Sequence, residues 1–214
     1  NLPAFMDSRY ITVDGKPMFV IWNPNDHSDE IVLFIKTWRK MAENNGLKGI
    51  YFVARQFLGT SVKELIDMGF DAVYQERTQQ AMNGGESFSL VHRIRNRIQK
   101  IFGIQVFLDK HDFNKCFKLL VNEEAKKENV IPSLVAGYDR SPRAGKKAQI
   151  FYNFTPETWR KHVKDVFSYI KNKDDEHRLV ILKSWNEWGE SNYLEPDLKY
   201  GTSMLDVLKE ENDD

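Results

Sequence analysis

The apolar residues of the chain fall into short continuous runs that alternate with longer segments of three-and-four spacing. Runs of about four to eight apolar residues are typical of buried strands, and the three-and-four spacing is typical of amphipathic helices. The runs predict strands at residues 18–22, 49–54, 70–74, 130–136 and 178–184. The spacing predicts helices at residues 29–45, 61–67, 87–102, 112–127, 155–171 and 205–211, with polar loops at 75–86 and 139–147.

Continuous apolar strands separated by helices indicate parallel βαβ units whose sheet is covered on both faces. The sequence therefore predicts an α/β fold, organised as a single domain over residues 1–214. The glycines after the strands lack the spacing of a dinucleotide-binding or phosphate-binding loop, which weakens a Rossmann interpretation. In a (β/α) barrel the chemistry lies at the carboxyl ends of the strands, so the loops of interest begin at Trp22, Arg55, Gln75, Gly137 and Trp185.

Charge and composition exclude several classes of protein. The 214 residues carry 31 basic and 31 acidic side chains, so the whole chain has no field that would favour nucleic acid or an anionic membrane. No apolar run approaches the roughly 18 residues that a membrane-spanning helix needs. Cys116 is the only cysteine, which excludes an internal disulfide, favours a structural thiol and fits a reducing, cytoplasmic location.

The segment of residues 183–197 follows the last predicted strand and combines aromatic and acidic side chains. Such a mixture is unusual for a plain surface loop, because the aromatic rings gain nothing in water and the acids lose much if buried. Sugar binding uses both types: a pyranose packs on an indole, while carboxylates and amides hold the hydroxyls. The candidate sugar-binding residues here are Trp185, Asn186, Trp188, Tyr193 and Glu195.

Glu187 and Glu190 are three residues apart, so a helical or tight-turn backbone places both carboxylates within reach of one ligand. Glycosyl hydrolysis requires two carboxylates, one acting as an acid and the other ionised. The alternative is structural: either glutamate caps the following turn or pairs with Arg140, Arg143 or Lys147.

A second group of polar residues, Tyr138, Asp139 and Arg143, follows the strand at 130–136. Asp139 and Arg143 form either a loop salt bridge or a fork that binds hydroxyls or phosphate. Asn23, in the loop after the first strand, is a further candidate for substrate binding.

The five histidines have no ligand spacing, so we expect no metal site, and the sequence shows no nucleotide site that would imply a cofactor. His162 falls at a polar phase of its helix and is expected to be exposed. The predicted helix at 87–102 carries a row of basic residues, which is either a solvated face or a contact for phosphate, polysaccharide or a protein partner.

Several motifs resemble those of one family. Residues 7–19 (DSRYITVDGKPMF) are similar to the mid-chain signature of the WbsX-type glycosyltransferase family, and residues 185–188 (WNEW) and 194–197 (LEPD) are similar to its C-terminal signature. Weaker matches follow in the same order at residues 38–39, 46–50, 69–72 and 138–139. The resemblance implies a role in O-antigen or other surface polysaccharide synthesis, and a (β/α) barrel shared with glycoside hydrolase family 99, the endo-mannosidases and endo-mannanases.

By that resemblance Glu187 would act as a base on the sugar 2-hydroxyl, giving an epoxide-like intermediate. Glu190 would protonate the leaving oxygen and then act as a base. Trp185, Asn186, Trp188 and Glu195 would line or support the sugar site. The resemblance leaves open whether the enzyme makes glycosidic bonds or breaks them.

Five predicted strands are fewer than the eight or so of a closed barrel. We therefore expect the chain to be the C-terminal portion of a barrel domain, completed by a missing N-terminal half or by a complementary chain. The substrate would be a glycan or a sugar donor. A truncated glycan-binding module without activity is the alternative.

Overall fold

The computed structural model describes residues 2–84, 94, 97–98, 101–102 and 108–213. The chain divides into two compact units, each described here by itself. Unit 1 comprises Asn1–Glu76, Glu124–Pro132 and Ile170–Leu179. Unit 2 comprises Arg77–Glu123, Ser133–Tyr169 and Val180–Asp214.

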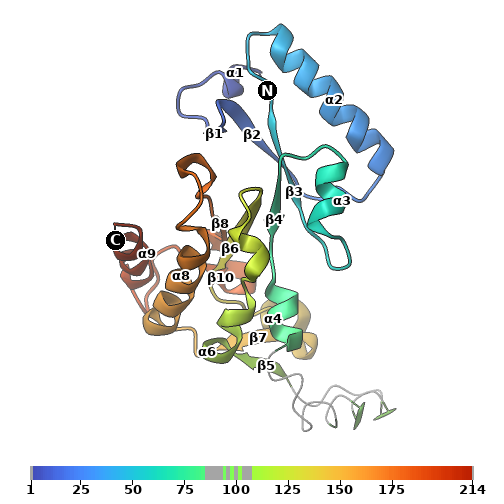
Figure 1. The fold of residues 1–214 in the computed structure, drawn as a ribbon. Coiled ribbons are helices and arrows are strands. Elements are labelled where there is room, and N and C mark those ends of the chain that lie inside the picture. Colours follow the sequence, from blue (N-terminus) through green and yellow to red (C-terminus); the bar gives the residue numbers. More distant parts are fainter. Residues whose placement is uncertain (1, 85–93, 95–96, 99–100, 103–107, 214) are drawn as a thin grey trace. The chain divides into compact units, whose positions relative to one another are not determined.

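Unit 1 is built on parallel strands (Figure 1). Its strands are β1 (Thr12–Val13), β2 (Lys16–Ile21), β3 (Tyr51–Arg55), β4 (Ala72–Gln75) and the first half of β6 (Val130–Val135). Its helices are α1 (Leu2–Phe5), α2 (Ser28–Asn44), α3 (Val62–Asp67) and the 3₁₀ turn η5 (Asp175–His177). β1 is antiparallel to β2, while β2, β3, β4 and β6 pair in parallel in that order.

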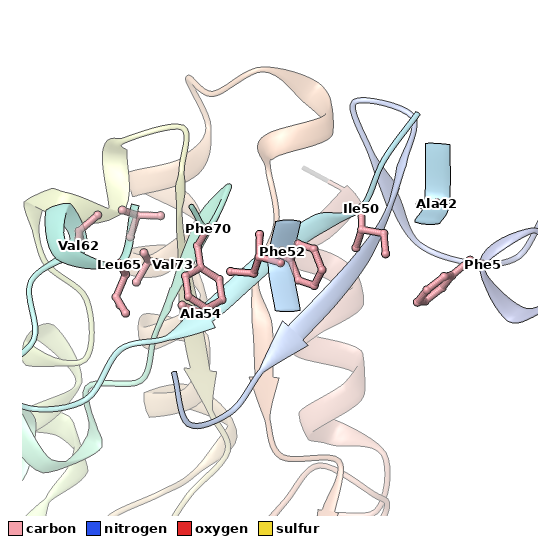
Figure 2. Close-up of a cluster of buried hydrophobic side chains, with 11 residues drawn as sticks. Phe5, Ala42, Ile50, Phe52, Ala54, Val62, Leu65, Phe70 and Val73 are labelled. Atoms are coloured by element: carbon pink, nitrogen blue, oxygen red, sulfur yellow. The ribbon is translucent and has the colours of Figure 1, made fainter. Parts of the chain in front are cut away.

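The core of unit 1 lies where α2 and α3 pack on these strands (Figure 2). Ile35 and Ala42 of α2 and Leu65 of α3 meet Phe52 and Val73 of the strands, all of them buried. α3 begins with the expected capping box, in which Ser61 and Glu64 exchange side-chain and backbone hydrogen bonds.

Arg39 fastens α2 to the strand ends in the same unit. Its Nη2 donates to the Gly69 carbonyl at 2.9 Å and pairs with Asp71 Oδ2 at 2.5 Å. Asp71 Oδ2 also accepts the backbone N–H of Phe52 at 2.8 Å. The partly buried carboxylate of Asp71, in the turn between α3 and β4, therefore joins that turn to α2 and to β3.

In the described part of unit 2 the strands form three pairs (Figure 1). The second half of β6 is parallel to β8 (Ile181–Lys183), β5 (Asp109–Asp112) is parallel to β7 (Gln149–Tyr152), and β9 (Asn186–Glu187) is antiparallel to β10 (Asn192–Tyr193). The helices are α4 (Thr78–Gly84), α6 (Phe113–Cys116), α7 (Ser141–Ala144), α8 (Pro156–Ile170, whose last residue falls in unit 1) and α9 (Ser203–Asp213). The 3₁₀ turns are η2 (Phe117–Leu119), η4 (Gly145–Lys147) and η6 (Trp188–Glu190).

The core of unit 2 gathers around Phe113, with Met82, Cys116, Leu120 and Phe151 fully or almost fully buried against it. Cys116 is buried, in keeping with the structural thiol that the sequence favours.

His162 of α8 is completely buried, so the expectation that it is exposed is wrong. Its Nε2 accepts the backbone N–H of Val135 at 3.1 Å, and its ring packs edge-on against Phe113 and tilted against Trp159. A polar residue that accepts a hydrogen bond from a buried backbone N–H can occupy the apolar face of a helix. Helical phase alone does not predict such a hydrogen bond.

The α/β class and the five predicted strands are confirmed, as are the helices now seen as α2, α3, α8 and α9. Three predictions are wrong in part. The polar stretch 75–86 contains α4, whose Thr78, Ala81 and Met82 are buried. The loop 139–147 contains α7 and η4.

The single helix predicted for 112–127 is broken into α6, η2 and η3 (Glu123–Lys126), because Asp112 caps a first short turn and the chain passes from unit 2 to unit 1 after Glu123. The strands β5 and β7 were not predicted. The basic helix predicted for 87–102 falls largely outside the described residues.

Loss of the Asp71 carboxylate should destabilise unit 1, because it removes the ion-pair partner of Arg39 and the acceptor of the Phe52 N–H. We expect Asp71→Ala to lower the free energy of unfolding by about 2 kcal/mol, measured by urea denaturation. Lys63→Ala is the control: it removes an exposed ion pair with Asp67 and should cost less than about 0.5 kcal/mol. Equal losses in the two variants would contradict this account of Asp71.

His162 should make stability depend on pH. Complete burial lowers the pKa of His162 from 6.5 to about 3. A histidine with a lowered pKa in the folded state stabilises the fold fully above pH 6.5, and this contribution is lost as the pH falls below 6.5, because the unfolded chain binds the proton first. The slope approaches about 1.4 kcal/mol per pH unit.

The measurement is urea unfolding at pH 7 and pH 5 of the parent chain and of His162→Gln, which retains an acceptor but does not titrate. We expect a flatter pH dependence in the variant. The same slope in both proteins would mean that His162 is not the group responsible.

Candidate active site

The predicted sugar-binding segment forms a small hairpin after β8. The chain passes through a cis peptide bond between Lys183 and Ser184, then Trp185, and enters β9. The turn η6 carries the chain into β10, and Asn192 lies opposite Glu187 in the register of the hairpin. Glu187 and Glu190 therefore occupy the two ends of one tight turn, as their spacing predicted.

Asn192, which the sequence analysis did not single out, holds this hairpin to the strand ends. The residue is buried, and its Nδ2 lies within hydrogen-bond distance of three carbonyl oxygens: Gly137 at 2.7 Å, Lys183 at 3.0 Å and Ala136 at 3.2 Å. Ser184 Oγ donates to the backbone carbonyl of Asn192. The sequence shows Asn192 only as an asparagine two residues after Glu190. That position does not distinguish a buried asparagine from an exposed turn residue.

Gly137 allows the second loop to approach the hairpin. Its φ of +72° lies in the left-handed region, and a Cβ there would meet Phe154 at 3.1 Å and the Ser191 carbonyl at 3.2 Å. The loop that follows is joined to the hairpin by a 2.7 Å hydrogen bond from the Asp139 N–H to the Glu190 carbonyl. The sequence-predicted residues Tyr138 and Asp139 are thus brought beside the hairpin.

Arg143 joins the two carboxylates. Its Nη1 lies 2.9 Å from Glu190 Oε1 and 4.0 Å from Glu187 Oε1. Arg140 Nε is a further 3.5 Å contact of Glu190. The side chain of Glu190 is 15% exposed and that of Glu187 is 45% exposed, so the Glu187 carboxylate is the more open to solvent.

Two ion pairs considered from the sequence can be compared with the contacts in the structure. Glu190 does pair with Arg140 and Arg143, as the structural alternative expected. Arg143 does not pair with Asp139, whose Oδ1 instead accepts the Ser141 N–H at 2.8 Å. The ion pair with Arg143 brings both glutamates to one guanidinium nitrogen, so it also places them within reach of one ligand.

The aromatic residues of the hairpin form an ordered stack. The rings of Trp188 and Tyr193 lie 3.7 Å apart at 17°, and Trp188 Nε1 donates to Glu195 Oε2 at 2.7 Å. Tyr193 donates its hydroxyl to Asp197 Oδ2 at 3.0 Å. Partial burial, and then this hydrogen bond, raise the pKa of Tyr193. Trp185 and Trp188 remain about half exposed.

A hollow of about 370 Å³ opens beside the stack. Aromatic and acidic side chains share its wall, as in a site for a flat, hydroxyl-rich ligand. The lining includes Tyr138, Asp139, Tyr193, Glu195, Asp197 and Tyr200. The hollow is not lined by Glu187, Glu190 or the two indoles of the hairpin. Asn23 is the one candidate outside unit 2: it belongs to unit 1, where its side chain is exposed and contacts Asp26.

Among the described residues, no group of three or more His, Cys, Asp or Glu side chains is arranged to hold a metal ion. Within the same residues, no helix is both long and apolar enough to cross a membrane.

Comparison with known proteins identifies the family. Residues 1–208 match the family described as Glycosyltransferase WbsX, so the chain belongs to that family of carbohydrate-active enzymes. Two curated relatives, one from each of two strains of Xanthomonas campestris pv. campestris, are both described as "Uncharacterized protein WxcX". Each is 25% identical to this chain over 203 residues. The match covers 94% of this chain and 28% of each relative, so the chain spans little more than a quarter of their length.

A solved structure titled "Glycoside hydrolase-like protein" is similar in fold. The TM-score is 0.59 at 16% sequence identity, and the match covers 96% of this chain and 56% of the other. The likeness supports the α/β fold that the strand pairing of both units displays.

Removing the side chain of Asn192 should loosen the site. Asn192→Ala withdraws the shared donor from three carbonyl oxygens in a buried place, so we expect the free energy of unfolding to fall by about 3 kcal/mol in urea denaturation. The matched control is Asn83→Ala, an exposed asparagine of α4 in the same unit, with an expected change of less than about 0.5 kcal/mol. Similar losses in both variants would argue against a central role for the Asn192 amide.

Proposed function

We propose that this chain carries the reacting carboxylates of an enzyme that acts on glycosidic bonds in surface polysaccharide metabolism, such as O-antigen synthesis. The observation that carries the proposal is the placement of Glu187 and Glu190 on one tight turn, within 4.0 Å of a single Arg143 nitrogen and flanked by half-exposed indoles. Membership of the WbsX family supports a sugar substrate.

The two carboxylates suit different roles. Glu187 is the more exposed and is proposed to take the proton of a sugar 2-hydroxyl, whose oxygen then attacks the anomeric carbon as the leaving oxygen departs. Glu190 is proposed to protonate that leaving oxygen and afterwards to take a proton from the acceptor hydroxyl or water. The acceptor oxygen then bonds to the anomeric carbon, the bond from that carbon to the 2-oxygen breaks, and the 2-oxygen regains its proton from Glu187. Because Arg143 occupies Glu190 Oε1, this contact has to open or shift when the leaving group arrives.

The remaining candidates are proposed as binding residues. Trp185 and Trp188 offer apolar ring surface, while Asn186, Asp139 and Glu195 offer hydrogen-bond partners for hydroxyls. Tyr138 and Tyr193 line the adjacent hollow, and Arg143 orients the carboxylates.

We also propose that residues 1–214 form part of one catalytic (β/α) barrel domain. The parallel strands and the hydrolase-like structural relative support this architecture. The candidate site follows the carboxyl ends of β6 and β8, which is where barrels carry their chemistry.

A retaining endo-glycosidase of the mannosidase or mannanase kind is the second candidate. It is favoured by the carboxylate pair, which is the chemistry of hydrolases, together with the hydrolase-like structural relative. Transfer and hydrolysis differ only in whether an acceptor hydroxyl or water attacks last.

Neutralising either carboxylate should remove activity and leave binding. We expect Glu187→Gln and Glu190→Gln each to lower kcat by about a hundredfold or more in the full-length protein, with little change in the Kd for the glycan. The assay follows labelled oligosaccharide by chromatography: elongation indicates transfer and shortening indicates hydrolysis.

The control is Glu157→Gln, an exposed glutamate that pairs with Lys161 on α8, and its activity should equal that of the parent. If the Glu187 and Glu190 variants retain full turnover, the proposed reacting pair is wrong. If the parent binds glycan and has no turnover of either kind, the chain is a binding module.

A further inference from the structure

A second cluster of aromatic and polar residues lies in unit 1, in the loops after β2, β3 and β4. Trp22 follows β2 and is 59% exposed, although an indole of this size gains free energy from burial. Arg55 ends β3, Phe57 follows it, and Glu76 follows β4. These loops begin at carboxyl ends of parallel strands, the edge where α/β proteins bind ligands.

The guanidinium of Arg55 packs over one face of the Trp22 indole. The guanidinium carbon lies 4.0 Å from the centroid of a Trp22 ring and 4.3 Å from that of Phe57. Because the cation covers one face of Trp22, the opposite face is the one available to a ligand. The cation–π attraction favours one orientation of the ring.

The support itself is largely buried. Arg55 Nη2 pairs with Glu76 Oε2 at 2.9 Å, and the two side chains are only 16% and 8% exposed. Within the described residues, the buried Nε of Arg55 has no hydrogen-bond partner. A buried ion pair with an unsatisfied donor contributes little stability, and here the pair holds the guanidinium against Trp22.

The loops around the cluster are tied together. Asn25 Nδ2 donates to Thr60 Oγ1 at 2.9 Å, Gln56 Nε2 donates to the Thr60 carbonyl at 2.6 Å, and Gln75 Nε2 donates to Gln56 Oε1 at 2.8 Å. A preordered aromatic face loses little conformational entropy when a ligand binds.

We propose that Trp22 is a stacking platform for a pyranose ring, making unit 1 a glycan-binding surface in its own right. The open face of the indole receives the apolar face of the sugar. Asn23 follows Trp22 in the sequence, and its side chain and that of Asp26 are exposed and suited to hydroxyls. The choice of a glycan as ligand rests on the proposed function, but the residues involved are distinct from the carboxylates and aromatic rings of unit 2.

The test uses the indole N–H signals of the five tryptophans in a ¹H–¹⁵N NMR spectrum of the Glu187→Gln protein, each signal assigned by a Trp→Phe variant. The probes are defined oligosaccharides selected from a printed array by their binding to this protein. We expect the Trp22 signal to shift on titration, while Trp159, which is fully buried, does not shift.

Trp22→Ala should weaken the affinity measured at this surface about tenfold, which corresponds to about 1.4 kcal/mol. Trp22→Tyr should recover part of the loss. Leu58→Ala is the control, since it removes an even more exposed apolar side chain from the neighbouring loop and should leave affinity unchanged. The thermal midpoint of each variant is measured as well: a variant that is fully folded at the temperature of the binding assay has lost binding and not folding.

The outcomes separate this inference from the proposed function. Shifts of Trp185 and Trp188 without a shift of Trp22, or equal affinity after Trp22→Ala, would overturn the platform and leave the carboxylate site standing. A Trp22 shift with an inactive parent enzyme would support the platform and contradict the proposed catalysis. If no oligosaccharide on the array binds, both proposals are wrong.

Discussion

The arrangement of the candidate site depends on one buried amide. The Nδ2 group of Asn192 reaches the carbonyls that end β6 and the last carbonyl of β8, so the carboxyl ends of two parallel strands are held at a fixed separation by a side chain from the hairpin. Backbone carbonyls that are buried without a hydrogen-bond partner are unfavourable. Asn192 supplies a donor to the carbonyls of Ala136 and Gly137 that follow β6, while the Lys183 carbonyl also accepts the Ala136 N–H at 2.8 Å. The same interactions hold the hairpin that carries Glu187 and Glu190.

Electrostatics then decides how the two carboxylates coexist. Two like charges on a three-residue turn repel each other, and Arg143 contacts both while Arg140 contacts Glu190. The unequal exposure of the two side chains gives them different surroundings despite their closeness in sequence. Division of roles between neighbouring carboxylates generally arises in this way, from environment and not from residue type.

The sequence predicted those features that follow from local pattern. The α/β class, α2 with its three-and-four spacing and the capping box at Ser61 depend on nearby residues, and so does the approach of Glu187 to Glu190. What it missed depends on distant partners. Asn192 and His162 are polar residues buried because backbone groups far along the chain need them, and α4 forms because Met82 packs on Phe113 and Cys116. No window of neighbouring residues contains that information.

The single thiol of the chain lies at the centre of the unit 2 core, and unit 1 contains no cysteine. A thiol-reactive reagent reaches Cys116 only when that core opens, because a buried sulfur cannot be attacked in the folded state. The rate at which Cys116 is modified therefore reports how often the core of unit 2, which holds the two glutamates, opens. Motions confined to unit 1 do not change that rate.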